Sequence, residues 1–448
     1  MRRSASAATQ LKLMVRRRIL IRCGPMRYIV CTHEPRIPLM NRPVLPSRRL
    51  LVPALFGLLI ASAPAQSKRS AEDAFTPVRI DMAEMIEEGA AVGLVGAGTV
   101  GGELVFAHAA GMRDREAGAE VDVDTIFRIF SMTKPITCVA ALTFYDEKRF
   151  ELDDPVSDYL PELVDLKIEG KGGEEDRPLE SPMKVRDLFQ HTSGWSYETP
   201  WERVAQENGN AQPDLEDMVT ALSTLPLLFQ PGSRWEYGIS NDVLGRFIEV
   251  LAEKPLDEVF QERIFAPLGM SDTGFHVDEE DLDRLMRMYF RMGKDLVADP
   301  ETAKSDPTRN PAHLSGGGGL YSTAGDYLRF LAMMRGKGSL DGKRVLKSET
   351  VALMLRDQIG DIPRSMVLGN KGYGLGVSVV TEASELGGSL GTWSWGGAAG
   401  TMFWVDPEQD EAVILMNQTW LDFGPAFRFA AWMGPALAKT SGKRQRHD

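Results

Sequence analysis

The chain has 448 residues, of which 43% are hydrophobic and 25% charged, and its formal net charge is −12 at pH 7. These values are typical of a globular protein and exclude collagen-like, coiled-coil and disordered chains. The charge is uneven, because the residues up to Ala65 include twelve Lys or Arg and a single acid, Glu34. The remaining chain is strongly acidic, which argues against nucleic acid or an anionic membrane surface as a partner.

The basic N-terminal part contains the pattern of a secretory signal peptide at residues 40–65. Three arginines precede a short apolar run from Leu50 to Ala61 and the small-residue site Ala63-Pro64-Ala65. We expect cleavage near Ala65 and export to the periplasm or the cell exterior, by the general or the twin-arginine route. The apolar run is too short to span a membrane and no Cys follows it, so no stable membrane anchor is expected.

Residues 1–39 fit neither signal type. We interpret them as a mis-assigned extension ahead of a true start at Met40, with a disordered basic tail as the alternative. Two of the three cysteines, Cys23 and Cys31, lie in this extension. The mature chain would therefore keep Cys138 alone, without a disulfide, and we expect it to be a buried thiol.

Apolar periodicity predicts the elements of the mature chain. Apolar residues at helical spacing predict a helix at 75–88, and a glycine-rich turn predicts a hairpin over 91–107. A short strand or turn at 127–130 precedes a strongly apolar helix at 133–148. Residues 150–310 contain mostly helical segments separated by prolines. Helices are expected there at 185–190, 214–222, 242–252 and 256–265.

The C-terminal part returns to strands. After four consecutive glycines, we expect a helix at 324–335, strands at 373–381, 400–405 and 412–416, and a closing helix at 421–437. This order predicts an α+β fold in which N- and C-terminal helices flank an antiparallel sheet and an all-helical second lobe is inserted. The expected domain covers 66–440, with a sheet lobe at about 75–150 and 315–440, a helical lobe at about 151–314, and a polar tail at 441–448.

Ser131 and Lys134 form an S-x-x-K pattern at the start of the apolar helix. At i and i+3 they are neighbours on a helix. A serine is a poor nucleophile unless a base takes its proton, and a lysine can be that base only if its pKa is lowered. A helix start also offers backbone N–H groups to a developing oxyanion. The pattern alone is weak, because it also occurs by chance at ordinary helix starts.

Two further motifs follow in order. Tyr237 lies in a turn before an amphipathic helix, within a run from Gln230 to Gly245. The run from Trp393 to Pro407 places small residues inside a strand pattern, where another backbone can approach closely. With these motifs and the run Leu188–Gly194, the chain resembles the serine β-lactamase-like superfamily, which includes class C β-lactamases and D-alanyl-D-alanine peptidases. The resemblance is closest to the family VIII carboxylesterases and extends from about Met82 to the closing helix.

This resemblance implies a role for each motif. Ser131 would be the acylated nucleophile, and Lys134 and Tyr237 would share the general-base work. The backbone N–H groups of Ser131 and Ala398 would form the oxyanion hole. The substrate-binding residues Trp395, Gly396 and Gly397 would take the place of a Lys-Thr-Gly strand.

The last of these matches departs from the family pattern. Trp395 and Gly396 replace the cation and the hydroxyl that help to hold a substrate carboxylate in β-lactamases and peptidases. The site loses hydrogen-bond donors and gains apolar surface, which favours neutral acyl esters over carboxylated lactams. Asn241 follows Tyr237 by four residues rather than the two of the class C pattern, so its role is not carried over.

Other motifs are given less weight. Ser389 matches a G-x-S-x-G elbow, but that motif needs a helix directly after it and a later Asp and His, whereas a strand pattern follows. Gly316–Gly319 lacks the ending of a phosphate loop and predicts a turn. No His pair has metal-ligand spacing, so neither a metal nor another cofactor is expected.

Together these observations predict an exported serine hydrolase, a carboxylesterase that cleaves short neutral acyl esters through a Ser131 acyl-enzyme. The alternatives are a β-lactamase or D-alanyl-D-alanine carboxypeptidase, an acyltransferase, or a catalytically inactive binding module. The expected partner is a small-molecule ester or lactam, and the oligomeric state stays open.

Overall fold

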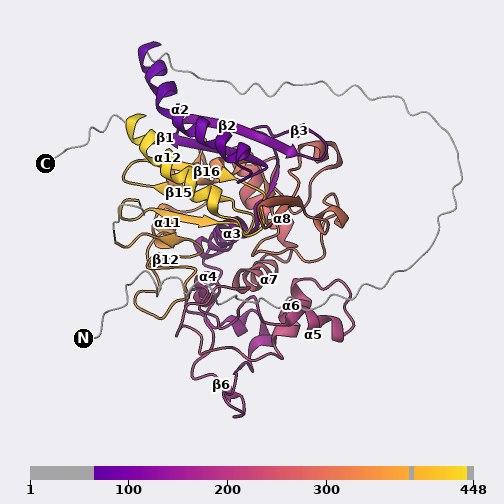
Figure 1. Cartoon of the computed structure of the whole chain (residues 1–448). Coiled ribbons are helices and arrows are strands. Elements are labelled where there is room, and N and C mark those ends of the chain that lie inside the picture. The colour runs from indigo at the N-terminus through magenta and orange to yellow at the C-terminus, as the bar shows by residue number, and fades with distance from the viewer. Residues whose placement is uncertain (1–64, 383–387, 441–448) are drawn as a thin grey trace, which may run out of the picture. The chain divides into compact units, whose positions relative to one another are not determined.

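The computed structural model describes residues 65–382 and 388–440 (Figure 1). The expected extension at 1–39, nearly all of the expected signal peptide and the tail at 441–448 lie outside the described residues. Within the described part of the chain, no helix is long and apolar enough to cross a membrane.

The centre of the fold is an eight-stranded antiparallel sheet in the order β12-β13-β14-β15-β16-β1-β2-β3. Its strands are β1 (Gly93–Val100), β2 (Glu103–Asp114), β3 (Ala119–Glu120), β12 (Gly372–Tyr373), β13 (Ser378–Val379), β14 (Trp393–Gly396), β15 (Met402–Asp406) and β16 (Glu411–Met416). The N-terminal hairpin joins the C-terminal strands at β1 and β16, where Val95 lies opposite Met416.

The strand predicted at 373–381 is instead two short strands separated by a turn. Gly376 adopts a φ of 95°, which favours glycine, and a Cβ at Gly374 would lie 2.1 Å from the Met354 carbonyl oxygen. These two glycines therefore divide the predicted strand into β12 and β13. The closing helix also begins later than predicted, after Leu421 with its φ of 52°.

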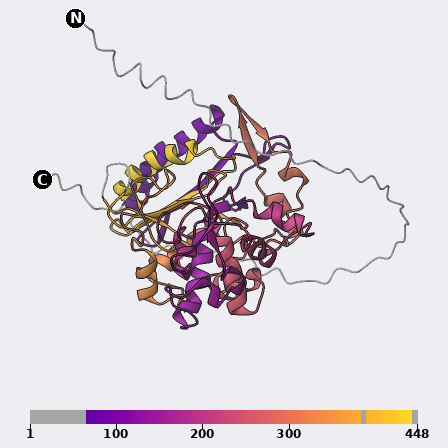
Figure 2. The ribbon, with the colours of Figure 1, turned by 90° about the horizontal axis from the view of Figure 1, so that it is seen from below.

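The two terminal helices lie side by side on one face of the sheet (Figures 1 and 2). They are α2 (Ala65–Glu87) and α12 (Gly424–Thr440). Side chains alternate along a strand, so Leu94 and Leu415 point to this face while their neighbours point to the other. Arg428 of α12 bridges to Asp81 of α2, at 2.6 Å, to Glu84 of the same helix and to Glu88 directly after it.

The opposite face of the sheet packs on α3 (Thr133–Asp146) and α10 (Ala324–Arg335). Residues 133–144 of α3 are all buried, which explains why its sequence is apolar on every side. The largest core cluster surrounds this helix and continues into the helical lobe. The start of α3 is therefore held rigidly between the sheet and that lobe.

The α+β architecture is confirmed, with one difference of detail in the lobe at 151–314. Its helices are α4 (Val185–Gln190), α5 (Trp201–Glu207), α6 (Leu215–Leu222), α7 (Ser240–Ala252), α8 (Leu256–Phe260) with a π-helical continuation (Gln261–Phe265), and α9 (Ala266–Leu268). The lobe was expected to be all-helical, but it also contains two short hairpins, β5 (Lys167–Ile168) with β6 (Arg177–Pro178) and β7 (Tyr289–Met292) with β8 (Asp295–Ala298). The Gly- and charge-rich residues at 170–176 form the exposed turn of the first hairpin.

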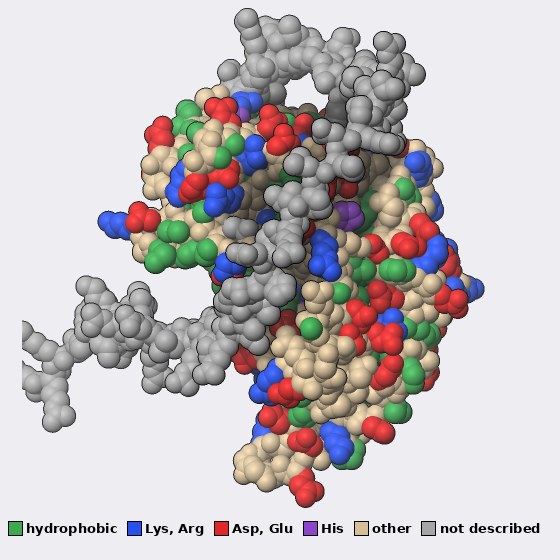
Figure 3. Space-filling model, turned by 90° about the vertical axis from the view of Figure 1, so that its right-hand side faces the viewer, with side chains coloured by type: hydrophobic (Ala, Val, Ile, Leu, Met, Phe, Trp, Pro, Cys, Tyr) green, Lys and Arg blue, Asp and Glu red, His purple; other side chains and the backbone are tan. Residues whose placement is uncertain are grey.

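The remaining elements are short. They are β4 (Phe127–Arg128), β9 (Tyr321–Ser322), β10 (Ser339–Leu340), β11 (Lys343–Arg344) and α11 (Ser348–Met354). On the face shown in Figure 3, acidic side chains are spread among Lys and Arg side chains over the described surface. This distribution agrees with the acidic composition of the chain after residue 65.

Candidate active site

Ser131 lies on a strained turn between β4 and α3. The strand β4 pairs with β9, and the Gln418 side chain clamps Arg128 by accepting from its N–H at 2.8 Å and donating to its carbonyl at 3.1 Å. Phe130 has a φ of 43°, a left-handed conformation that is costly for a bulky residue. A 3₁₀ turn at Phe130–Met132 then leads into α3. The clamp before the turn and the buried helix α3 after it fix the position of the Ser131 hydroxyl.

Lys134 points from the first turn of α3 back to Ser131, as its spacing predicts. Its side chain is fully buried. The Nζ atom donates to Ser131 Oγ at 3.1 Å, to Tyr197 Oη at 2.7 Å and to the Gly317 carbonyl at 2.6 Å. These three acceptors match the three protons of an ammonium group. The neighbouring Pro135 is tolerated because its missing N–H has no partner in a first turn.

A lysine can act as a general base only if its pKa is lowered, but the surroundings of Lys134 raise its pKa. Burial by itself would lower the pKa of Lys134, but Tyr197, Tyr237 and Asp242 outweigh burial and hold that pKa above its ordinary value. Burial raises the pKa of Tyr197 above its ordinary value as well. The resting site therefore holds an ammonium beside a neutral Tyr197 phenol. A base appears only when this coupled cluster loses one proton.

Tyr237 lies beside Lys134, but its hydroxyl has a different partner. The Lys134 Nζ is 4.8 Å from the centre of the Tyr237 ring, while Tyr237 Oη accepts from Trp395 Nε1 at 3.3 Å. The ring stacks on Trp235 with an interplanar angle of 8° and meets the edge of His191 at 4.9 Å. The structure thus places Tyr237 within an aromatic wall that also contains Trp395.

Tyr197 is the functional candidate that sequence reasoning missed. From the sequence, Tyr197 clusters with Trp195 and Trp201 near the presumed cleft, with core packing as the first interpretation and substrate contact as the second; the two tryptophans are buried. Tyr197 is 54% exposed, however, and only its hydroxyl turns inward to Lys134. Its sequence signal is weak, since a Tyr shortly after the Thr192-Ser193-Gly194 turn has no distinctive spacing to the S-x-x-K pattern.

The backbone segments of the predicted oxyanion hole approach each other closely. Gly397 approaches the residues before Ser131 so closely that a Cβ there would lie 2.3 Å from the Ile129 carbonyl oxygen. The Ala398 carbonyl accepts from the Leu421 N–H at 2.6 Å, which orients this loop. Within residues 65–382 and 388–440, no backbone acceptor is bonded to the N–H of Ser131 or Ala398. Both amides are therefore available to a developing oxyanion.

The four glycines at 316–319 form a turn, as predicted, and supply an acceptor to the site. A Cβ at Gly316 would lie 2.5 Å from the Asn241 carbonyl oxygen, and one at Gly317 would lie 2.4 Å from Asp242 Oδ2. Only glycines allow this turn to reach the start of α7. Because the turn lies so close to α7, the Gly317 carbonyl can accept the hydrogen bond from Lys134 Nζ.

Asn241, Cys138 and Ser389 are not among the hydrogen-bond partners of Lys134. Asn241 Nδ2 donates to Cys138 Sγ at 3.3 Å, and both side chains are buried. Burial raises the pKa of the Cys138 thiol, which agrees with the expected inert thiol. Ser389 lies in a turn followed by β14 rather than by a helix, so the elbow motif is excluded. Among the described residues, no group of three His, Cys, Asp or Glu could hold a metal ion.

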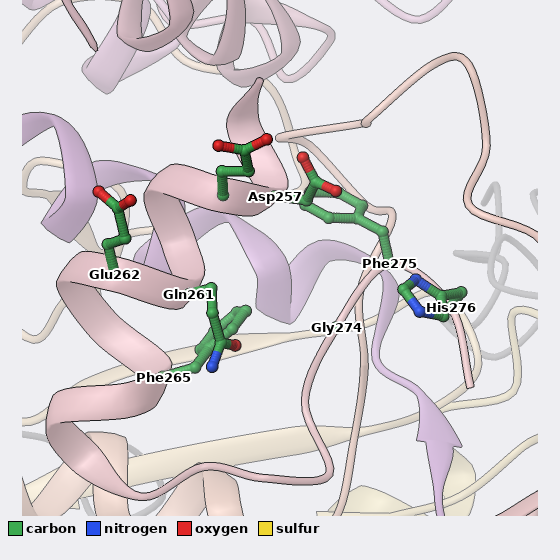
Figure 4. Close-up of a pocket in the computed structure, with 8 residues that line it drawn as sticks. Asp257, Gln261, Glu262, Phe265, Gly274, Phe275 and His276 are labelled. Carbon is green, nitrogen blue, oxygen red and sulfur yellow. The ribbon is translucent and has the colours of Figure 1, made fainter. Parts of the chain in front are cut away.

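A separate surface cavity of about 320 Å³ lies beside α8 and its π-helical continuation (Figure 4). Its lining includes Asp257, Glu262, Phe265 and His276. None of the residues around Ser131 lines this cavity. It is therefore not part of the candidate active site.

Comparison with known proteins agrees with this geometry. The Beta-lactamase family model matches residues 80–428. The chain belongs to the Beta-lactamase family. It is 37% identical to Protein Rv1367c of Mycobacterium tuberculosis (strain ATCC 25618 / H37Rv) over 361 residues, which cover 75% of this chain and 88% of that protein.

Two other relatives have described activities. Esterase EstB of Burkholderia gladioli is 32% identical over 346 residues, covering 71% of this chain and 83% of that protein. The solved structure of EstCE1, described as a hydrolase with promiscuous acyltransferase activity, superposes with a TM-score of 0.69 at 25% identity, covering 82% of this chain and 99% of that one. The chain is thus a serine hydrolase of the β-lactamase fold.

Proposed function

We propose that this protein is a carboxylesterase that cleaves short neutral acyl esters through an acyl-enzyme on Ser131. The observation that carries the proposal is the fully buried Lys134 amine bonded to Ser131 Oγ at 3.1 Å on a strained turn. The similarity to EstB supports ester hydrolysis over other acyl-transfer chemistry.

In the proposed mechanism, the cluster of Lys134 and its tyrosines first loses one proton to solvent. Ser131 Oγ then attacks the ester carbonyl carbon while its proton passes to this cluster, with Lys134 and Tyr237 sharing the general-base work. The N–H groups of Ser131 and Ala398 stabilise the oxyanion. The cluster returns the proton to the leaving alcohol as the ester C–O bond breaks. Water deacylates the enzyme by the same steps.

The pH dependence follows from the direction of the Lys134 pKa. A raised pKa keeps the cluster fully protonated at neutral pH, so the base form becomes more abundant as the pH rises. The value of kcat should therefore increase with pH along a rising limb until the cluster has lost its proton.

The proposed preference for neutral substrates rests on the residues around Trp395. This side chain packs edge-on against Tyr237 and Tyr373, each with ring centres 5.3 Å apart, and Gly396 follows it. Neither residue offers a cation or a hydroxyl to a carboxylate. A charge-assisted hydrogen bond of that kind contributes about 1.5–3 kcal/mol, or roughly 10–150-fold in binding.

The test is a panel of p-nitrophenyl acetate to butyrate esters beside a chromogenic cephalosporin. We expect kcat/KM for the esters to exceed that for the cephalosporin by at least about 100-fold. Trp395→Lys should narrow the gap by restoring a cation. Comparable efficiency on the cephalosporin in the unmodified enzyme would replace the esterase proposal with the β-lactamase alternative.

Acyl transfer to an alcohol is the second candidate function, favoured by the description of EstCE1. An exposed apolar rim lies next to the nucleophile turn, where the Phe130 and Trp420 rings are 5.3 Å apart and Leu421 follows. Such a rim would bind an apolar alcohol that competes with water for the acyl-enzyme. Adding an alcohol to the ester assay should yield a transesterified product if this second function exists.

The proposal of export rests on residues 40–65 alone. N-terminal sequencing of the protein recovered outside the cytoplasm should give a start near Gln66. Retention of Arg2 to Leu39 would contradict both the signal peptide and the mis-assigned extension.

A further inference from the structure

Asp242 is a buried carboxylate in the first turn of α7, five residues after Tyr237. Its Oδ1 accepts from the Gly317 N–H at 3.1 Å and from the Ser315 hydroxyl at 2.5 Å. His313 Nε2 lies 3.7 Å from the same oxygen, and the His313 ring stacks on Trp201 with centres 5.0 Å apart. A buried charge is costly unless it is paired and hydrogen-bonded; Asp242 accepts two hydrogen bonds and lies beside the titratable His313.

The Gly317 peptide connects this carboxylate to the candidate active site. Its N–H donates to Asp242, and its carbonyl accepts from Lys134 Nζ at 2.6 Å. The absence of a side chain at Gly317 is required, since a Cβ there would overlap Asp242 Oδ2. Carboxylate, peptide and ammonium therefore form one continuous link from α7 to α3.

Asp242 also supplies negative charge next to a buried cation. The other groups near Lys134 are the hydroxyls of Ser131 and Tyr197, the ring of Tyr237, the thiol of Cys138 and the imidazole of His191. Burial raises the pKa of Cys138 and lowers that of His191, so neither group carries a charge at neutral pH. Burial would lower the pKa of His313, but Asp242 outweighs burial and raises it. When it is protonated, His313 partly offsets the Asp242 charge.

We propose that Asp242 is a positioning residue for acyl transfer, which fixes the Lys134 amine against Ser131 through the Gly317 peptide and stabilises its ammonium form. This inference rests on the proposed Ser131-dependent function. It adds a residue that does not touch the substrate and that acts through a backbone group.

The test is Asp242→Asn, which keeps the shape of the side chain and removes its charge. We expect kcat for p-nitrophenyl butyrate on the plateau to fall about 10- to 100-fold, because the amine loses its fixed position, with little change in KM. The rising limb of kcat should move to lower pH by at least about half a unit, because the cluster loses its proton more readily without the nearby anion. Ser315→Ala is the matched control: it removes one hydrogen bond to Asp242 but keeps the charge, so the limb should not move.

Two results would overturn the inference: an unchanged rate and limb in Asp242→Asn, or a slower enzyme whose limb has not moved. The second result would mean that Asp242 only supports the fold. If thermal unfolding shows that Asp242→Asn does not fold, His313→Gln provides a second test, because it removes the group that compensates the Asp242 charge. It leaves Asp242 less compensated and should move the limb to higher pH, whereas an unmoved limb or a shift to lower pH contradicts the inference.

Labelling by a fluorophosphonate probe separates this inference from the proposed function. If the wild-type protein is not labelled at Ser131, the proposed function itself fails. If the wild type is labelled and Asp242→Asn is labelled equally fast at every pH, the function stands and the role of Asp242 is wrong.

Discussion

The two sides of the candidate active site are held together by different interactions. On the catalytic side, Ser131, Lys134, Tyr197 and Gly317 are joined by hydrogen bonds of 2.6–3.1 Å. On the aromatic side, Trp395 contacts Tyr237 and Tyr373 through ring edges, with centres 5.3 Å apart. The two sides meet where Lys134 lies over the Tyr237 ring.

This difference separates reaction chemistry from substrate recognition. Hydrogen bonds are directional and fix where each proton lies, whereas ring contacts bury apolar surface without holding a charge. Under the proposed function, Trp395 in place of a cation would alter which substrates the site binds and leave the proton-transfer groups intact.

The largest expected effect is on the catalytic side, at the nucleophile. Ser131→Ala should lower kcat by at least about 10³-fold, since covalent catalysis is lost while binding remains. Ser389→Ala is the matched control and should change little, because Ser389 lies in a turn before β14. Ester assays on both purified variants, with circular dichroism to confirm folding, decide the point. Near-normal activity of Ser131→Ala would rule out the assigned nucleophile.

The next effect concerns the proton-transfer group. Lys134→Arg keeps the positive charge but cannot deprotonate, and a guanidinium is larger than the buried ammonium that it replaces. We expect kcat to fall nearly as far as in Lys134→Ala, by about 10²–10³-fold. Steady-state kinetics of the two variants make the comparison. An active Lys134→Arg enzyme would mean that Lys134 supplies only positive charge.

Substitutions of Tyr237 and Tyr197 test which of the two phenols takes part in proton transfer. Tyr237→Phe keeps every ring contact and removes the phenol that we propose shares the general-base work, so kcat should fall about 10²-fold. Tyr197→Phe removes one acceptor of Lys134 and should cost about tenfold, the effect of one neutral hydrogen bond. Measured kcat values for the pair decide the assignment. The reverse order would move the catalytic phenol from Tyr237 to Tyr197.

Local spacing explains which parts of this site could be predicted from the sequence. Ser131 and Lys134 are three residues apart on a helix, so their contact follows from helix geometry alone. The apolar periods likewise predicted α3, α7 and α10 near their observed bounds. The family resemblance then added Tyr237 and Ala398.

The contacts that could not be predicted join distant parts of the chain. Tyr197 reaches Lys134 across 63 positions and Gly317 reaches Asp242 across 75. Both depend on turns whose shape is set by tertiary packing. The charge of Lys134 was also unpredictable, because it depends on whether nearby anions outweigh burial.

The last prediction tests the backbone junction between the two sides of the site. Gly397 ends the substrate-binding strand against the nucleophile turn, where an added Cβ would lie 2.3 Å from the Ile129 carbonyl oxygen. A backbone atom cannot move aside cheaply, so Gly397→Ala should push β14 away from Ser131 and displace the Ala398 amide. We expect kcat to fall about tenfold or more, with a loss of about 1–3 kcal/mol in the free energy of unfolding.

At Gly396 a Cβ would lie 3.1 Å from the Thr401 carbonyl oxygen, a tight contact that a shift of a few tenths of an ångström relieves. Gly396→Ala should therefore keep most of its activity, and urea unfolding with ester kinetics on both variants measures the difference. Equal effects at the two glycines would mean that the junction does not depend on this close approach and that the oxyanion hole is held by the Leu421 contact instead.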